Sequence, residues 1–170
     1  MSTERIILEL AEKQAIYELM AHYADRIDAN DPAGAAACFA EDGLGVYWQD
    51  CIGPKAIEER LIGILDRFHA TSHHLSNVQI KLTGETTATA QAYVYAFHRL
   101  KADMENPMHY WGRWVDELAK VDGQWKFKRR EVVGIRSINR GADDLDHTGH
   151  PGRLSREGSA PADFLAKADA

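Results

Sequence analysis

The sequence predicts an α+β domain in which helices come first and a curled, mainly antiparallel sheet follows. In the first part of the chain, apolar residues recur at steps of three and four, which is typical of amphipathic helices. In the second half, apolar and polar residues alternate over long runs, which is typical of β-strands. This order of elements indicates that the helices cover one face of the sheet.

The first helix is expected over residues 3–28, either unbroken or interrupted near Glu12. Its apolar stripe consists of Ile16, Leu19, Met20, Tyr23 and Ile27. Asp28 lies about 100° from the centre of this stripe, at the edge of the buried face. The helix should end there, because the segment that follows contains poor helix formers and then Pro32.

Two more helices and one strand are expected before the main run of strands. Asp31 should cap a short helix that begins at Pro32. A longer helix is expected over residues 55–68, after the Gly-Pro break at positions 53 and 54. Between these helices, residues 41–43 should form a turn and residues 44–49 a strand that includes Tyr47.

The second half predicts strands over residues 77–82, 86–100, 109–121 and 125–138. In the 86–100 strand, His98 falls on a face rich in alanine, and Tyr93, Tyr95 and Phe97 fall on the other face. Residues 121–124, Val-Asp-Gly-Gln, are a strong hairpin signal. From residue 139 the composition shifts to Gly, Asp, His, Pro and Ser, so we expect a domain over 1–138 and an extended or partly disordered extension over 139–170.

Composition limits the class of protein. The 170 residues suit one domain, and a content of 45% hydrophobic and 27% charged residues is typical of globular proteins. A net charge of -6 argues against a nucleic-acid partner, and no apolar run approaches the length of a membrane span. With no signal-peptide pattern, and with Cys38 and Cys51 outside any metal or redox motif, a cytoplasmic location is expected.

Asp28 can be interpreted in two ways. A carboxylate in the last turn faces the negative end of the helix dipole, so helix stability does not explain it. It is either a solvated acid that starts the turn or a half-buried group. In the second case, burial and the dipole should raise its proton affinity, and Asp28 would be a base or would orient a base.

Three motifs carry a resemblance to a known family. They are Y-x-x-x-x-D from Tyr23 to Asp28, T-x-H-x-x-x-N around His73, and D-G-x-W before the last strand. With the order of elements, these make residues 5–138 resemble the SnoaL-like proteins of the nuclear-transport-factor-2-like superfamily. The resemblance implies a cone-shaped barrel, in which a strongly curved, mixed and mainly antiparallel sheet wraps around the N-terminal helices.

The resemblance also implies a site. Asp28 and His73 fall where the dehydratases and dehydrochlorinases of the family keep their catalytic pair, and His98, Tyr23 and Tyr47 match auxiliary groups of different members. Scytalone dehydratase has a tyrosine where Ile27 stands here, so no single member is matched completely. The residues expected to bind substrate are Arg136, Phe97, Trp111 and Met108.

The chemistry of such a site is β-elimination from a small cyclic or polycyclic, apolar, hydroxylated substrate. A histidine, with an ordinary pKa of about 6.5, can take a proton beside a carbonyl, and a carboxylate can fix its tautomer. This step needs no metal or organic cofactor. A metal remains the alternative, held by His69 and His73 four apart on a helix, or by Asp28, His73 and His98.

Two other functional classes share this fold. One is an isomerase or cyclase of the ketosteroid isomerase kind, and the other is a non-catalytic binding subunit such as the β-subunit of ring-hydroxylating dioxygenases. The dehydratases of the family are trimers, so a homotrimer is favoured over a dimer. The aromatic face of Tyr93, Tyr95 and Phe97 is expected at that interface, and the extension should cross the pocket mouth or a neighbouring subunit.

Overall fold

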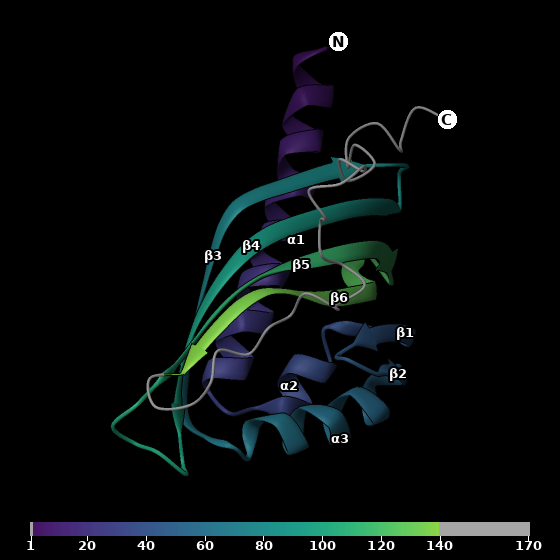
Figure 1. Cartoon of the computed structure of the whole chain (residues 1–170). Coiled ribbons are helices and arrows are strands. Elements are labelled where there is room, and N and C mark those ends of the chain that lie inside the picture. The colour runs from purple at the N-terminus through teal and green to yellow at the C-terminus, as the bar shows by residue number, and fades with distance from the viewer. Residues whose placement is uncertain (1, 140–170) are drawn as a thin grey trace, which may run out of the picture.

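The structure is a computed structural model, and it describes residues 2–139. The helices are α1 (Thr3–Asp28), α2 (Pro32–Ala36) and α3 (Gly53–Leu65). The strands are β1 (Phe39–Val46), β2 (Asp50–Ile52), β3 (Phe68–Leu82), β4 (Thr87–Leu100), β5 (Met108–Val121) and β6 (Gln124–Asn139). The predicted α+β class is confirmed (Figure 1).

The strands form one curved sheet in the order β2-β1-β6-β5-β4-β3. β1 runs parallel to β6, and all other neighbours are antiparallel, so the sheet is mixed and mainly antiparallel as expected. The sheet is not closed, because β2 and β3 form its two edges. The site is therefore set in an open, curved sheet rather than in a continuous barrel.

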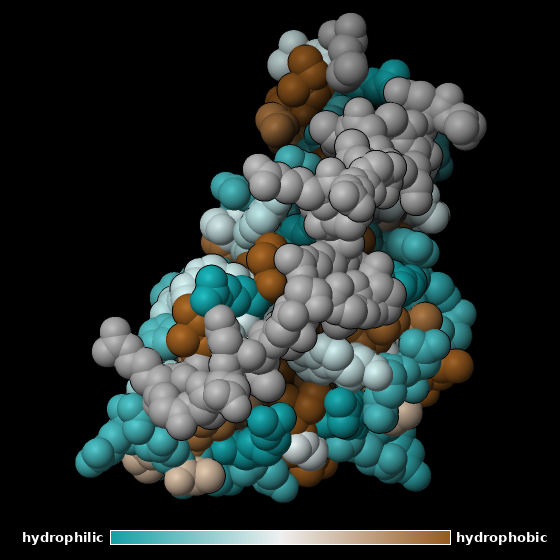
Figure 2. Space-filling view, viewed as in Figure 1, coloured by the Kyte–Doolittle hydropathy of each residue, from teal (hydrophilic) through white to brown (hydrophobic). Residues whose placement is uncertain are grey.

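Helix α1 is one unbroken element, so the interruption near Glu12 does not occur. The residues around Glu12 are good helix formers, and an ion pair between Glu9 and Lys13 at 2.6 Å supports this turn. The N-terminal turns project beyond the sheet, and Figure 2 shows hydrophobic atoms on that projecting end. The C-terminal half of α1 buries the predicted stripe, including Ile16, Met20, Tyr23 and Ile27.

Two boundaries differ from the sequence-based expectation. Residues 41–43 belong to β1 and not to a turn, because the strand continues past an irregularity between Phe39 and Leu44 in its pairing with β6. Helix α3 ends at Leu65, and residues 68–76 extend β3 in place of a helix end. In the second segment, pairing with β4 overrides a local sequence that has little strand pattern.

The core lies between α1, α3 and the concave face of the sheet. Alternate residues of β4 face it, as predicted, and most of them are small: Ala88, Ala90, Ala92, Val94, Ala96 and His98. The β5–β6 hairpin turns through Asp122 and Gly123, both with positive φ, as its sequence predicted. Of the helices in the described range, none is long and apolar enough to cross a membrane.

The described residues do not cover the expected extension. Residues 140–170 lie outside them, so the path of the extension and the boundary at residue 138 stay predictions.

Candidate active site

The end of α1 and the beginning of β3 bring Asp28 and His73 together. The side chains form a hydrogen bond of 2.6 Å between Nδ1 of His73 and Oδ1 of Asp28. The backbone N–H of His73 donates to Oδ2 at 2.8 Å, and the Thr71 hydroxyl donates to Oδ1 at 2.7 Å. Both carboxylate oxygens are thus engaged, and the Nε2 atom of His73 is left for other partners.

The environment of Asp28 keeps this carboxyl ionised. Burial raises its pKa, but hydrogen bonds from the ring and backbone of His73 and from Thr71 outweigh burial, so the pKa lies below its ordinary value. The expectation of a raised proton affinity at Asp28 is therefore wrong. Asp28 orients His73, and His73 is the group of the pair that can accept a proton.

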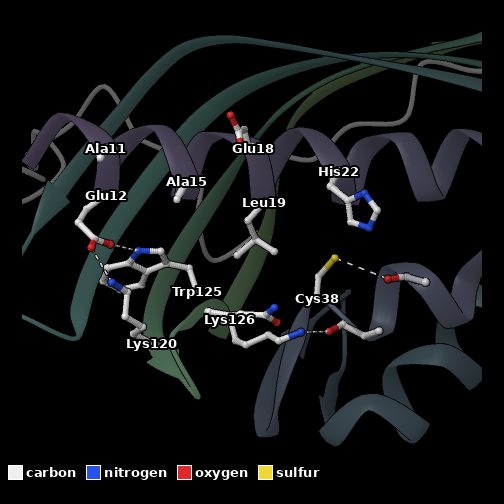
Figure 3. A pocket seen from close by; sticks show the side chains of 14 residues that line it. Ala11, Glu12, Ala15, Glu18, Leu19, His22, Cys38, Lys120, Trp125 and Lys126 are labelled. Atoms are coloured by element: carbon white, nitrogen blue, oxygen red, sulfur yellow. Dashed lines mark hydrogen bonds and ion pairs between the residues drawn. The ribbon is translucent and has the colours of Figure 1, made fainter. Parts of the chain in front are cut away.

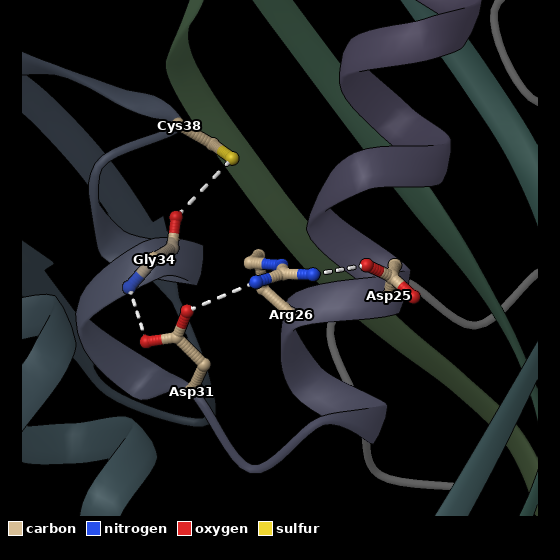
Figure 4. A network of polar contacts seen from close by, with 5 residues as sticks. All are labelled: Asp25, Arg26, Asp31, Gly34 and Cys38. Atoms are coloured by element: carbon tan, nitrogen blue, oxygen red, sulfur yellow. Dashed lines mark hydrogen bonds and ion pairs between the residues drawn. The ribbon is translucent and has the colours of Figure 1, made fainter.

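A polar network fixes the chain just after Asp28 (Figure 4). Arg26 is paired with Asp25 and, at 3.4 Å, with Asp31. Asp31 caps α2 as predicted, by accepting a hydrogen bond of 2.8 Å from the backbone N–H of Gly34. The turn thus has its own acid in Asp31, and Asp28 is not the solvated acid that starts it.

Tyr23 from α1 and Tyr47, just after β1, form a second pair. Their hydroxyl groups are 2.7 Å apart, and both side chains are buried. Burial raises the pKa of Tyr23 to about 12, although the positive charge of Arg130 opposes this. Burial also raises the pKa of Tyr47 well above its ordinary value. Both phenols are therefore neutral and can donate hydrogen bonds.

An ion pair lies behind Tyr23. Arg130 and Asp116 are completely inaccessible, and the guanidinium donates two hydrogen bonds to the carboxylate, at 2.8 and 2.7 Å. The guanidinium carbon lies 4.4 Å from the ring centre of Tyr23 and 4.3 Å from that of Trp114. Burial lowers the pKa of Arg130, but the charge and hydrogen bonds of Asp116, together with Tyr23 and Tyr47, outweigh burial, so the pKa is raised and the guanidinium stays protonated. The chain thus places a permanent positive charge against a phenol of the site.

His98 is neutral in this environment. Its side chain is only 8% exposed, and its ring centre lies 4.6 Å from that of Phe68 and 5.4 Å from that of His73. Burial lowers the pKa of His98 to about 3, and the charge of His73 acts in the same direction. Within residues 2–139, Nδ1 of His98 has no hydrogen-bond partner. His98 is therefore suited to contact a ligand and not to act as the base.

A cavity of about 430 Å³ joins these groups. Its wall includes five of the predicted residues: Tyr23, Tyr47, His73, His98 and Met108. Asp28 is not part of the wall, which agrees with a role through His73. Apolar side chains form much of the remaining wall, so the cavity suits a small, largely apolar molecule.

Three predicted substrate-binding residues, Phe97, Trp111 and Arg136, do not line this cavity. Phe97 and Trp111 point to the convex face of the sheet, where both rings contact His109. Arg136 is exposed and stands opposite Trp111 in the β5–β6 register. Strand alternation explains this, because neighbours of an inward residue such as His98 must face outward.

Other wall residues were missed from the sequence. The alternation that places Met108 inward also places Tyr110 inward, so the strand pattern contained that signal. Arg60 of α3 and Arg67 just after it also line the cavity. No pattern in the sequence distinguished these two from solvated helix residues.

A second depression, of about 610 Å³, lies between α1, α2 and the β5–β6 turn (Figure 3). Glu12 accepts hydrogen bonds there from Lys120 at 2.6 Å and from the indole N–H of Trp125 at 2.7 Å. Lys126 donates to the carbonyl of Ala37 at 2.7 Å. These contacts tie α1 and α2 to the hairpin.

Metal coordination was the alternative for the histidines. His69 and His73 lie in β3, so a pair four apart on a helix does not exist. Among residues 2–139, no group of three or more His, Cys, Asp or Glu side chains has an arrangement that could hold a metal ion.

Comparisons with known proteins agree with this architecture. The SnoaL-like domain matches residues 8–131. A solved structure of a proposed scytalone dehydratase from Novosphingobium aromaticivorans is 34% identical, with a TM-score of 0.74, over 86% of this chain and 97% of that one. A hexachlorocyclohexane dehydrochlorinase, LinA type 2, shares the fold at 17% identity, with a TM-score of 0.72, over 83% of this chain and 97% of that one.

A proposed aromatic ring hydroxylase from Novosphingobium aromaticivorans also has this fold, at 21% identity and a TM-score of 0.71, over 76% of this chain and 94% of that one. The comparison with curated proteins gave no match. The match to the SnoaL-like domain covers most of the chain and includes Asp28, His73 and both tyrosines. The chain belongs to the SnoaL-like family of the nuclear-transport-factor-2-like superfamily.

Proposed function

We propose that this protein is a cofactor-independent lyase that eliminates water from a small cyclic or polycyclic hydroxylated substrate. The observation that carries the proposal is the geometry of Asp28 and His73, in which an ionised carboxylate holds Nδ1 of a histidine at 2.6 Å on the wall of a largely apolar cavity. The similar proteins named as a scytalone dehydratase and as dehydrochlorinases support an elimination.

The proposed reaction begins when Nε2 of His73 removes a proton from a carbon beside the substrate carbonyl. The electron pair of the broken C–H bond moves toward the carbonyl oxygen, and one hydroxyl of the Tyr23–Tyr47 pair donates a hydrogen bond to the developing enolate while it accepts one from the other hydroxyl. The pair then returns to form the C=C bond as the C–O bond to the hydroxyl breaks. The His73 imidazolium gives its proton to the departing oxygen, so water leaves and the base is regenerated.

Asp28 supports both proton transfers. It fixes the tautomer that presents Nε2 to the cavity, and its negative charge stabilises the imidazolium. His98 stays neutral in this scheme and can contact the substrate hydroxyl.

A panel of cyclic β-hydroxyketones tests the proposal, with loss of water followed by mass and by the absorbance of the enone. His73→Ala and Asp28→Asn should each lower kcat by ~10²–10⁴-fold, the range for a lost general base. The double variant should be little worse than either single one, because the two groups act as a unit.

His74→Ala is the matched control, since this histidine is the next residue of β3 and contacts Tyr95 on the other face. It should keep the rate of the unchanged protein. Water loss that persists in both His73→Ala and Asp28→Asn would contradict the mechanism. A product of unchanged mass, with a moved double bond, would assign the pair to an isomerase.

A further inference from the structure

The cavity wall is positively charged in a protein whose net charge is -6. Of the described residues that line the cavity, two are arginines, Arg60 and Arg67, and none is an Asp or Glu. A basic wall in an acidic chain is not expected from average composition. It concentrates anions at this cavity and repels cations from it.

Arg60 is held in place at one side of the cavity. Its guanidinium donates a hydrogen bond of 2.9 Å to the backbone carbonyl of Tyr47, whose hydroxyl belongs to the tyrosine pair. The Nε atom of Arg60 is buried and, within residues 2–139, has no hydrogen-bond partner. The hydrogen bond to Tyr47 orients the guanidinium of Arg60, and Arg60 is one of the residues that line the cavity.

Arg67 lies at a second position on the wall. Its guanidinium carbon is 5.6 Å from the ring centre of Phe68, and the Phe68 ring lies against His98, 4.6 Å between centres. Its positive charge reaches into the site, since it is among the causes that lower the pKa of His98. Arg60 thus contacts Tyr47 directly, and Arg67 is separated from His98 by the ring of Phe68.

We infer that the substrate is an anion, a hydroxylated ring compound that carries a carboxylate, which Arg60 and Arg67 bind while the ring lies against His73 and the tyrosines. That this anion is a substrate, and not only a ligand, rests on the proposed lyase function. The carboxylate recognition itself depends only on the cavity. A guanidinium donates paired N–H groups to a carboxylate, and charge-assisted bonds of this kind are stronger than neutral ones.

Two ligands of the same size and shape, one charged and one neutral, separate the effect of charge on affinity from the effect of burying the ring. Binding of 2-naphthoate and of 2-naphthamide to the full-length protein is measured by calorimetry at low ionic strength. Naphthoate should bind ~10-fold more tightly than the amide, the ratio that one charge-assisted hydrogen bond supplies. High salt should reduce this preference, because it screens the interaction.

Arginine variants show which residues cause the preference. Arg67→Gln and Arg60→Gln should each weaken naphthoate binding by ~10-fold and leave the amide unchanged. Arg60→Lys should retain part of the preference, because it keeps the charge. Arg99→Gln is the control, since Arg99 is an exposed arginine of β4 outside the cavity.

Equal affinities for the two ligands, or a naphthoate preference unchanged in both glutamine variants, would overturn the inference. The binding result is independent of turnover. A naphthoate preference that depends on the arginines, without water loss from any β-hydroxyketone, would keep the anion site and reject the lyase. Elimination of neutral substrates only, without a preference for naphthoate, would keep the lyase and reject the anion site.

Discussion

Replacing His98 with Gln should change how the stability of the protein depends on pH. Burial lowers the pKa of His98 to about 3 in the folded state, whereas the pKa of a histidine in an unfolded chain is about 6.5. Below pH 6.5 the unfolded state therefore binds a proton that the folded state does not bind. Folding is then progressively disfavoured as the pH falls from 6.5 toward 3.

The size of the effect follows from these two pKa values. At pH 5 the folded side chain is still neutral and the unfolded one is almost fully protonated, so the wild-type protein should lose about 2 kcal/mol relative to pH 8 from this group. Glutamine does not titrate, so the variant lacks this loss. Its packing cost does not depend on pH and cancels when the same variant is compared at two pH values.

Urea unfolding of both proteins at pH 8 and pH 5 measures the difference. The free energy of unfolding of the wild type should fall by about 2 kcal/mol more than that of His98→Gln. His69→Gln, an exposed position of β3, controls for the loss of a histidine as such. Equal losses in wild type and His98→Gln would show that the folded protein protonates His98, and would refute its assignment as a neutral group in the cavity.

Three further predictions concern other parts of the molecule. Asp116→Asn leaves Arg130 buried without its charge partner and should lower the free energy of unfolding, measured in urea, by ~3–5 kcal/mol. The double variant Asp116→Leu with Arg130→Met should lose far less stability. Equal losses in the two variants would show that the unpaired charge is not the cause. The pKa of Asp28 is lowered on folding, so the ionised carboxylate stabilises the fold fully above the unfolded pKa of about 3.9, and this stabilisation is lost as the pH falls through the lower folded pKa. The difference in unfolding free energy between wild type and Asp28→Asn should therefore become smaller in acid. A difference that stays constant with pH would contradict the lowered pKa of Asp28. The aromatic convex face, where Tyr93 and Trp111 are each 38% exposed, should be an interface of a homo-oligomer, with a trimer favoured. Trp111→Glu should dissociate this oligomer, which light scattering would detect as a lower mass. A wild-type monomer at micromolar concentration would exclude the interface.

Local signals predicted most of the fold. The ends of α1 follow from its apolar stripe and from the Pro32 that comes after it, and the structure has the predicted limits, Thr3–Asp28. The β5–β6 hairpin needs two residues with positive φ, which Asp122 and Gly123 supply. In both places a few neighbouring residues determine the backbone, so no distant contact had to be known.

The first half of β3 could not be predicted in the same way. Residues 69–74 read His-Ala-Thr-Ser-His-His, with no alternation and no apolar stripe. They form a strand because β4 pairs with them across the sheet, from Phe68 opposite Leu100 to Leu82 opposite Ala88. Such pairing is a non-local property.

The unpredicted first half of β3 also explains why the pKa of Asp28 was expected to be raised and is lowered. From the sequence, only burial and the helix dipole could be considered, and both raise the pKa of a carboxyl. The three hydrogen bonds that lower it come from Thr71 and from the ring and backbone of His73, all in the part of β3 that the sequence did not reveal. The pair was predictable from the resemblance, but the protonation state of Asp28 needed the backbone around it.

Arg130 and Asp116 show a different limit of sequence reasoning. Charged residues in a strand are normally assigned to solvent, and these two are completely buried. Pairs of this kind are often replaced by apolar residues without loss of stability, so stability alone does not account for a guanidinium 4.4 Å from the ring of Tyr23. Its positive charge makes the phenol a stronger donor, which the enolate of the proposed reaction would require. We therefore expect the paired change to Leu and Met to keep the fold and to lower kcat, and unchanged turnover in the folded variant would leave the pair with a purely structural role.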